Sequence, residues 1–123
     1  MRSLSNPIED WRTRARQNLR AATLLAARHP PLLYPAVSRI YYACFQATCA
    51  ALLAKGIPCG EAHGDAWRVA NHVRLGLGTR LRRLYYWRRA ADYATRDIPD
   101  DDARDLVATY ARLTRELGIS EEA

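Results

Sequence analysis

Residues 34–56 form the longest apolar segment of the chain, and they constrain the fold more than any other stretch. Pro35 suits the first turn of a helix, and Gly56 followed by Ile57-Pro58 suits its end. Between these points apolar side chains recur every three or four residues, which is the helical period. A helix that is apolar on nearly all sides needs other helices around it, and its few polar side chains need partners there. Those polar side chains are Ser38, Arg39, Tyr41 and Tyr42.

Four further segments show the helical period, and none shows the alternation typical of a strand. Asn6-Pro7 suits the start of the first helix, and Thr79 suits the cap of the fourth. The sequence therefore predicts an all-α protein, an antiparallel up-and-down bundle of four to five helices. We expect a single domain over residues 1–123 with an ordered core at about 8–118. The helices are expected at about 6–28, 34–56, 62–75, 79–96 and 103–117.

Charge is distributed unevenly along the chain. Residues 1–96 hold 16 Lys and Arg against 5 Asp and Glu, whereas residues 97–123 hold 3 against 8. All but one of the basic residues are arginine, whose planar donor group suits phosphates, carboxylates and aromatic faces. A GC-rich genome or a thermophilic lifestyle also produces an arginine excess. The acidic C-terminal segment is equally consistent with docking on the basic surface of the same molecule.

Several classes of protein lack support in this sequence. It has no uncharged run of about 18 residues and no signal-peptide pattern, so we expect a cytoplasmic protein that does not enter the membrane. Cys44, Cys49 and Cys59 form no CxxC pair and are expected to be free thiols. There is no phosphate-binding glycine loop and no HExxH motif. We expect neither a metal site nor a cofactor.

Residues 79–96 are the most unusual segment, because they hold six arginines and a single acid. Arg88 shares a helical face with two leucines, so it should point inward and need a counter-charge. Asp92, four residues later, is the local candidate, and the hydroxyls of Tyr41 or Tyr42 are distant ones. The opposite side alternates arginine with aromatic residues, a pattern that suits either nucleic acid or a protein interface. Its members are Arg82, Tyr86, Arg89 and Tyr93.

His63 heads the apolar stripe of the third expected helix. A histidine in that position is more often a hydrogen-bonded structural residue than a catalyst. Arg68 and His72 lie four residues apart on the other face of the same helix.

Three of these features together resemble the HEPN domain family of small prokaryotic helical-bundle proteins. The segment AVSRIYYACFQATCAALLAKG, residues 36–56, is similar to the family's second helix, whose usual form is close to SRxYYAxFxAxxALLxxxG. His63 in AHGDAW looks like the histidine that opens the family's third helix. RRAADY, from Arg88 to Tyr93, looks like the R-x-x-x-D-Y signature near the end of the fourth. The resemblance covers about residues 8–118.

The resemblance implies a helical bundle that is commonly a homodimer and is often paired with a minimal nucleotidyltransferase (MNT) as a toxin–antitoxin system. Active family members are metal-independent endoribonucleases that use an Arg-x(4–6)-His motif from both protomers. The present sequence has no arginine followed by histidine at that spacing, since Arg68 and His72 have three residues between them. Asp92 and Tyr93 stand where the family's catalytic histidine would be sought.

Three hypotheses of function follow. The first is a HEPN-like component of a toxin–antitoxin or stress/defence module that binds RNA or a partner nucleotidyltransferase. The second is a non-catalytic interaction or nucleotide-sensing bundle. The third is a metal-independent endoribonuclease in which Arg88 holds the phosphate while His63 or Asp92 moves protons. The first hypothesis rests on the matched motifs and on the face with Arg82, Tyr86 and Arg89, whereas the other two rest on residues of an expected polar site. That site is formed by Ser38, Arg39, Tyr41, Tyr42, His63, Arg88, Asp92 and Tyr93.

Overall fold

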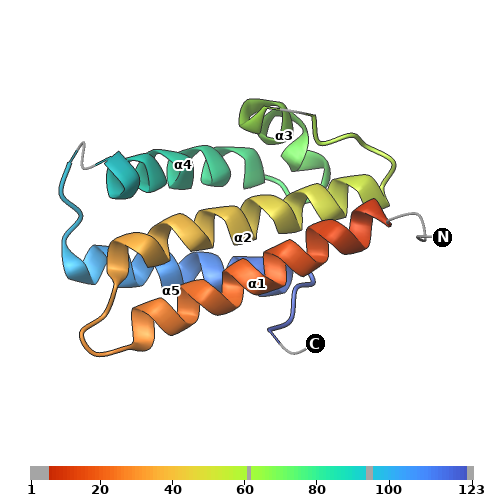
Figure 1. The fold of residues 1–123 in the computed structure, drawn as a ribbon. Coiled ribbons are helices and arrows are strands. Elements are labelled where there is room, and N and C mark those ends of the chain that lie inside the picture. The colour runs from red at the N-terminus through yellow and green to blue at the C-terminus, as the bar shows by residue number, and fades with distance from the viewer. Residues whose placement is uncertain (1–5, 61, 94–95, 122–123) are drawn as a thin grey trace.

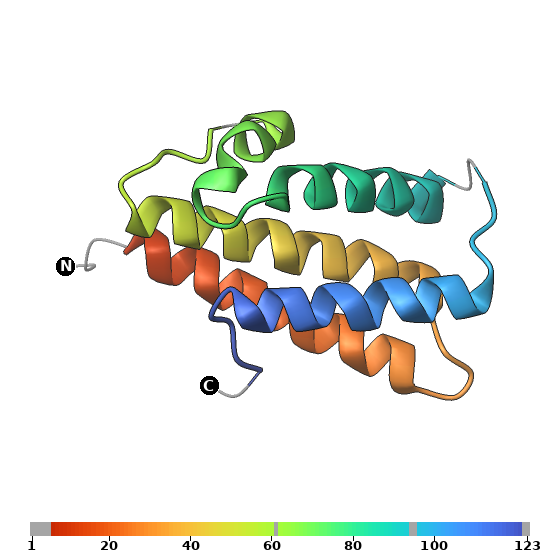
Figure 2. The same ribbon diagram turned by 180° about the vertical axis from the view of Figure 1, so that it is seen from behind.

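The computed structural model describes residues 6–60, 62–93 and 96–121. Five α-helices and a short 3-10 helix follow one another, and no strand occurs in these described ranges. Figure 1 shows α2 lying between α1 and α4, and the reverse view in Figure 2 shows α5 running along the far side of α2. The predicted all-α bundle with antiparallel packing is therefore confirmed. The elements are α1 (Pro7–Ala27), α2 (Leu33–Ala54), α3 (His63–Val69), η1 (Ala70–His72), α4 (Leu77–Tyr93) and α5 (Asp100–Glu116).

Helix α2 is the centre of the bundle, as its apolar sequence predicts. It packs against α1, α4, α5 and the α3–η1 segment, and most of its residues are buried. Its buried hydroxyl at Thr48 donates a hydrogen bond of 2.8 Å to the carbonyl oxygen of Cys44, so that polar group is satisfied within the helix. Burial raises the pKa of the Cys44 thiol to about 12, which keeps it protonated and unreactive. All three cysteines are free and buried.

Local sequence signals explain where α1 begins. The side chain of Asn6 accepts hydrogen bonds from the backbone N–H groups of Ile8 and Glu9, at 3.1 and 3.4 Å. Pro7 occupies the first helical position, where its missing N–H costs no hydrogen bond. The predicted start of this helix is therefore confirmed.

The start of α4 differs from the prediction. The helix begins at Leu77, so Thr79 lies inside it and is not its cap. Asn71 supplies a capping acceptor instead, because its side-chain oxygen lies 3.3 Å from the backbone nitrogen of Gly78. A Cβ atom at Gly78 would come within 2.3 Å of the carbonyl oxygen of Trp67, so glycine allows α4 to start directly against α3. The expected continuation of this helix through residues 94–95 lies outside the described residues.

Two other helices also depart from their expected bounds. The third is α-helical only over His63–Val69 and then tightens into η1, so it is shorter than expected. The last begins at Asp100, earlier than expected, because three consecutive aspartates occupy its first turn. Negative charge is favourable there, since the free N–H groups give the start of a helix a partial positive charge.

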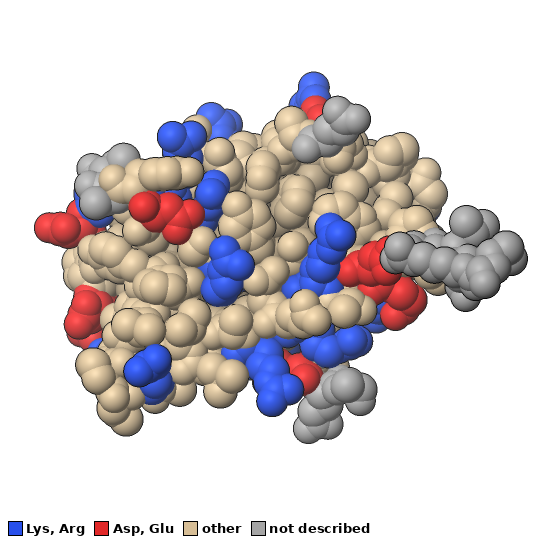
Figure 3. Space-filling view, viewed as in Figure 1, with Lys and Arg blue, Asp and Glu red and all other residues tan. Residues whose placement is uncertain are grey.

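The acidic C-terminal segment docks on basic side chains of the same molecule. Arg12 and Arg16 of α1 donate hydrogen bonds to the carbonyl oxygens of Gly118 and Ser120, and Arg74 pairs with Glu116 at 2.6 Å. Figure 3, viewed as in Figure 1, shows basic side chains spread over that face of the molecule, with most of the acidic ones toward its left and right ends. None of the helices in the described residues has the length and apolarity needed to cross a membrane.

Candidate functional site

Arg88 of α4 points at α2, as its helical face predicts. Its side chain is only 13% exposed, and its guanidinium lies over the rings of Tyr42 and Tyr85, 5.2 and 5.5 Å from their centroids. Its Nε atom is 3.0 Å from the Asp92 carboxylate. The Nε–H bond of Arg88 does not point at the carboxylate oxygen as a hydrogen bond requires, so this contact is an ion pair. The predicted pairing of Arg88 with Asp92 is confirmed, whereas Tyr42 contributes its ring face and not its hydroxyl.

Ser38 and Arg39 border this cluster on the α2 side. The Ser38 hydroxyl donates to the Asp92 carboxylate at 3.3 Å, so the carboxylate joins α2 to α4. The Arg39 guanidinium also lies over the Tyr42 ring, at 5.2 Å, and it donates to the side chain of Asn18 on α1. Two guanidinium groups therefore contact one tyrosine ring, and a single carboxylate partly offsets their charge.

His63 lies at the start of α3, inside an aromatic cluster. Its Nδ1 atom is 2.7 Å from the Tyr41 hydroxyl, and its ring is close to those of Tyr42, Phe45 and Tyr85. The indole N–H of Trp67 is 3.4 Å from the same Tyr41 hydroxyl. Because an indole N–H can only donate, the hydroxyl oxygen accepts from Trp67 and its own proton is available to His63.

The protonation of His63 depends on its burial, on the charge of Arg88 and on the hydrogen bond to Tyr41. When the Tyr41 hydroxyl donates to Nδ1, a neutral His63 carries its proton on Nε2. Burial, and to a smaller extent the positive charge of Arg88, lowers the pKa of His63, which favours that neutral form. Burial also raises the pKa of the Tyr41 hydroxyl, which keeps it protonated and able to donate.

The side of α4 that faces away from α2 alternates arginines with exposed rings. The Arg82 guanidinium lies over the Tyr86 ring at 5.9 Å, and that of Arg89 over the Tyr93 ring at 5.5 Å. Tyr86 and Tyr93 are 58% and 61% exposed. Within the described part of the chain, neither of these arginines pairs with a carboxylate. We call these four residues the outer face of α4.

The structure brings most of the expected polar residues together in two connected groups. Arg88, Asp92 and Ser38 form one group, and His63 and Tyr41 form the other. Tyr42 touches both, while the exposed ring of Tyr93 lies under Arg89 on the outer face.

Sequence reasoning missed the contributions of Tyr85 and Trp67. Tyr85 precedes Arg88 by three residues and so shares its helical face, a spacing that would have indicated the contact. Trp67 lies four residues after His63 and shares its apolar stripe, and the sequence carries no signal for the hydrogen bond from its N–H to Tyr41. Over the described ranges, no group of three or more His, Cys, Asp or Glu side chains is placed to hold a metal ion.

Fold and site together define a small helical bundle with a partly buried arginine–tyrosine–histidine cluster under an arginine-rich helix. A UPF0332 protein of Thermotoga maritima is 39% identical to the chain over 108 residues, which cover 81% of the chain and 80% of that protein. The chain belongs to the UPF0332 family. No family model matches the chain, and no solved structure matches it.

Replacing Arg88 with alanine should lower the free energy of unfolding by about 2 kcal/mol, because two cation–π contacts and an ion pair are lost. Urea denaturation measures this change. Arg104→Ala is the matched control, because the side chains of Arg104 and of its ion-pair partner Asp101 are 51% and 96% exposed. This variant should have the same free energy of unfolding as the wild type. Equal losses in both variants would contradict a structural role for Arg88.

The lowered pKa of His63 predicts a loss of stability in mild acid. As the pH falls below about 6.5, the unfolded chain takes up a proton before folded His63 does, so the folded state loses stability. Above that pH, His63 is neutral in both the folded and the unfolded state, and its full contribution to the free energy of unfolding is present. The fall in melting temperature between about pH 7.5 and 5.5 should therefore be smaller in His63→Gln than in the wild type.

His72→Gln is the control for this measurement, because His72 is exposed on η1. It should keep the pH dependence of the wild type. An identical pH dependence in His63→Gln and the wild type would rule out the proposed effect of His63.

Proposed function

We propose that this protein binds single-stranded RNA along the outer face of α4, as a HEPN-type component of a toxin–antitoxin or stress/defence module. The observation that carries the proposal is the alternation of arginine and exposed tyrosine on that face. From Arg82 to Tyr93 the face extends for roughly 16 Å, at 1.5 Å per helical residue. That length suits several nucleotides of an extended strand.

The chemistry of the outer face favours a single strand over a duplex. Arginines neutralise phosphates whatever the sequence, and tyrosine rings stack on any base that is not already stacked in a helix. Asp92 is the one acid among the described residues of α4, and it is paired with Arg88 on the inward side. The positive charge of Arg82 and Arg89 is therefore available to an anionic partner.

The resemblance to HEPN domains supports the same proposal and extends it to partners. It implies a homodimer and an MNT-type nucleotidyltransferase as the partner protein. Tyrosine and arginine are also enriched in protein interfaces, so a protein partner would find suitable chemistry on the same face. Co-purification with the product of the neighbouring gene, and the mass of the purified protein in solution, test these two partners.

Binding to an oligouridine of about 12 nucleotides tests the RNA proposal. The double variant Arg82→Gln/Arg89→Gln should bind about tenfold more weakly at low salt, and its affinity should depend less steeply on salt. The matched control is Arg14→Gln/Arg20→Gln, which removes the same charge from exposed positions on α1, beyond α2. Absence of wild-type binding at low salt, or equal losses in the two double variants, would refute the proposal.

A metal-independent endoribonuclease is the second candidate, favoured by one specific observation. His63 and Arg88 contact the same two rings, Tyr42 and Tyr85, although they lie far apart in the sequence. Cleavage by the ribose hydroxyl needs a proton acceptor, however, and Nδ1 of His63 is already hydrogen-bonded to the Tyr41 hydroxyl. The Asp92 carboxylate is likewise occupied by Ser38 and Arg88. This arrangement favours binding over cleavage.

An RNA cleavage assay in EDTA distinguishes the two candidates. If binding is the function, the wild type should leave the oligouridine intact. Cleavage by the wild type that is lost in Arg88→Ala and in His63→Gln would establish the nuclease instead. Cleavage that persists in both variants would point to a contaminating enzyme.

A further inference from the structure

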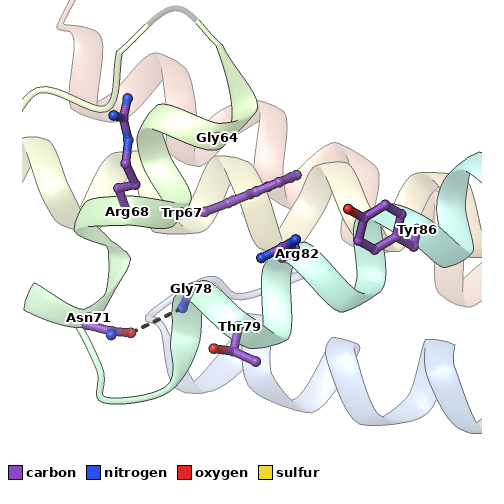
Figure 4. A pocket seen from close by; sticks show the side chains of 8 residues that line it. All are labelled: Gly64, Trp67, Arg68, Asn71, Gly78, Thr79, Arg82 and Tyr86. Carbon is purple, nitrogen blue, oxygen red and sulfur yellow. Dashed lines mark hydrogen bonds between the residues drawn. The ribbon is translucent and has the colours of Figure 1, made fainter.

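A cavity of about 460 Å³ opens between α3, η1 and the first half of α4. Figure 4 shows the Trp67 side chain reaching across it toward Arg82 and Tyr86. Its volume falls within the roughly 300–1,000 Å³ typical of small-molecule sites. The cavity is continuous with the outer face of α4, because Arg82 and Tyr86 belong to both. Its principal lining side chains are Trp67, Arg68, Asn71, Thr79, Arg82 and Tyr86.

The existing hydrogen bonds determine which groups the cavity offers to a ligand. The indole N–H of Trp67 is directed at Tyr41, so the carbon surface of the ring is left to line the cavity. The side-chain oxygen of Asn71 accepts from the backbone of Gly78, which fixes the amide orientation. The amino group of Asn71 makes no hydrogen bond to any described residue and remains free to donate.

The cavity therefore combines aromatic surface with hydrogen-bond donors and positive charge. The arginines at positions 68 and 82 line it, and no acidic side chain among the described residues does. Arg68 pairs with Asp65, whereas Arg82 lies over the ring of Tyr86 and pairs with no carboxylate of the described residues. Aromatic surface suits a base, amide donors suit the carbonyl oxygens of a base, and guanidinium groups suit its phosphate.

We propose that this cavity holds one unpaired base of the bound RNA strand, stacked against Trp67 and Tyr86, with the adjoining phosphate at Arg82. This inference rests on the RNA binding proposed above. The RNA strand runs along the outer face of α4, and one of its bases turns away from that path into the cavity. A base with ring carbonyl oxygens, such as uracil, matches the donors of Asn71.

Two substitutions fill the cavity from opposite walls. A Cβ atom at Gly64 of α3 would meet nothing within 4 Å, so Gly64→Phe places a ring in open space without a backbone clash. Thr79→Phe fills the cavity from an exposed position on α4. Gly64→Ala is the matched control, because it makes the same backbone change but adds only a methyl group.

The test compares an oligouridine of about 12 nucleotides with an abasic ribose-phosphate strand of the same length. Gly64→Phe and Thr79→Phe should bind the oligouridine about tenfold more weakly than the wild type does. Both variants should bind the abasic strand with the affinity of the wild type. Gly64→Ala should bind both strands like the wild type. Fluorescence anisotropy gives the affinities, and thermal unfolding verifies that each variant is folded.

The outcomes separate this inference from the proposed function. Wild-type affinity for oligouridine in a folded Phe variant would overturn the base-binding cavity and leave RNA binding intact. An equal loss for both strands would also overturn it, since the added ring would then obstruct the phosphates and not a base. If the wild type binds neither strand, both proposals fail.

Discussion

The contact of Arg88 with two tyrosine rings and a carboxylate determines how α4 sits on the bundle. A guanidinium that is 13% exposed is costly to bury unless its charge is compensated. Two ring faces and Asp92 provide that compensation from α2 and from α4 itself. With Arg88 directed inward, helical geometry turns the outer-face residues about 100–160° away from it. The inward ion pair and the outward arginine–tyrosine face are therefore two results of one helix orientation.

A second set of bonds holds the short α3 against the same surface. Seven residues are too few to form a stable helix alone, so α3 depends on its contacts with α2 and α4. The chain of hydrogen bonds from Trp67 through Tyr41 to His63 supplies polar contacts, and the surrounding rings supply apolar ones. The cavity lies between α3 and α4, so its shape depends on this arrangement. A neutral His63 thus supports the geometry of the cavity although it does not line it.

The fold was predictable from sequence because its signals are local or periodic. The apolar period of α2, the Asn6 cap and the four-residue spacing of Arg88 and Asp92 can all be read along the chain. The bond between His63 and Tyr41 could not be predicted, because it depends on the path of the loop between α2 and α3. The capping of α4 by Asn71 was missed for the same reason, since its donor lies seven residues away across a turn. The cavity exists only once these loops have placed α3 beside α4.

The location of the acidic groups explains why the outer face of α4 keeps its positive charge. Eight of the 13 acids in the chain lie in residues 97–123, and none of the described ones pairs with Arg82 or Arg89. Glu116 pairs with Arg74, and Asp102 and Asp105 line a pocket with Arg80 and Arg83 of α4. On α4 the single acid of the described residues is turned inward by its pairing with Arg88. Neutralising Arg82 and Arg89 would require a carboxylate on the outer side of the helix, and the described residues place none in contact with them. A phosphate strand, as proposed above, would supply that negative charge without disturbing the buried pair, which makes an anionic partner the simplest completion of this surface.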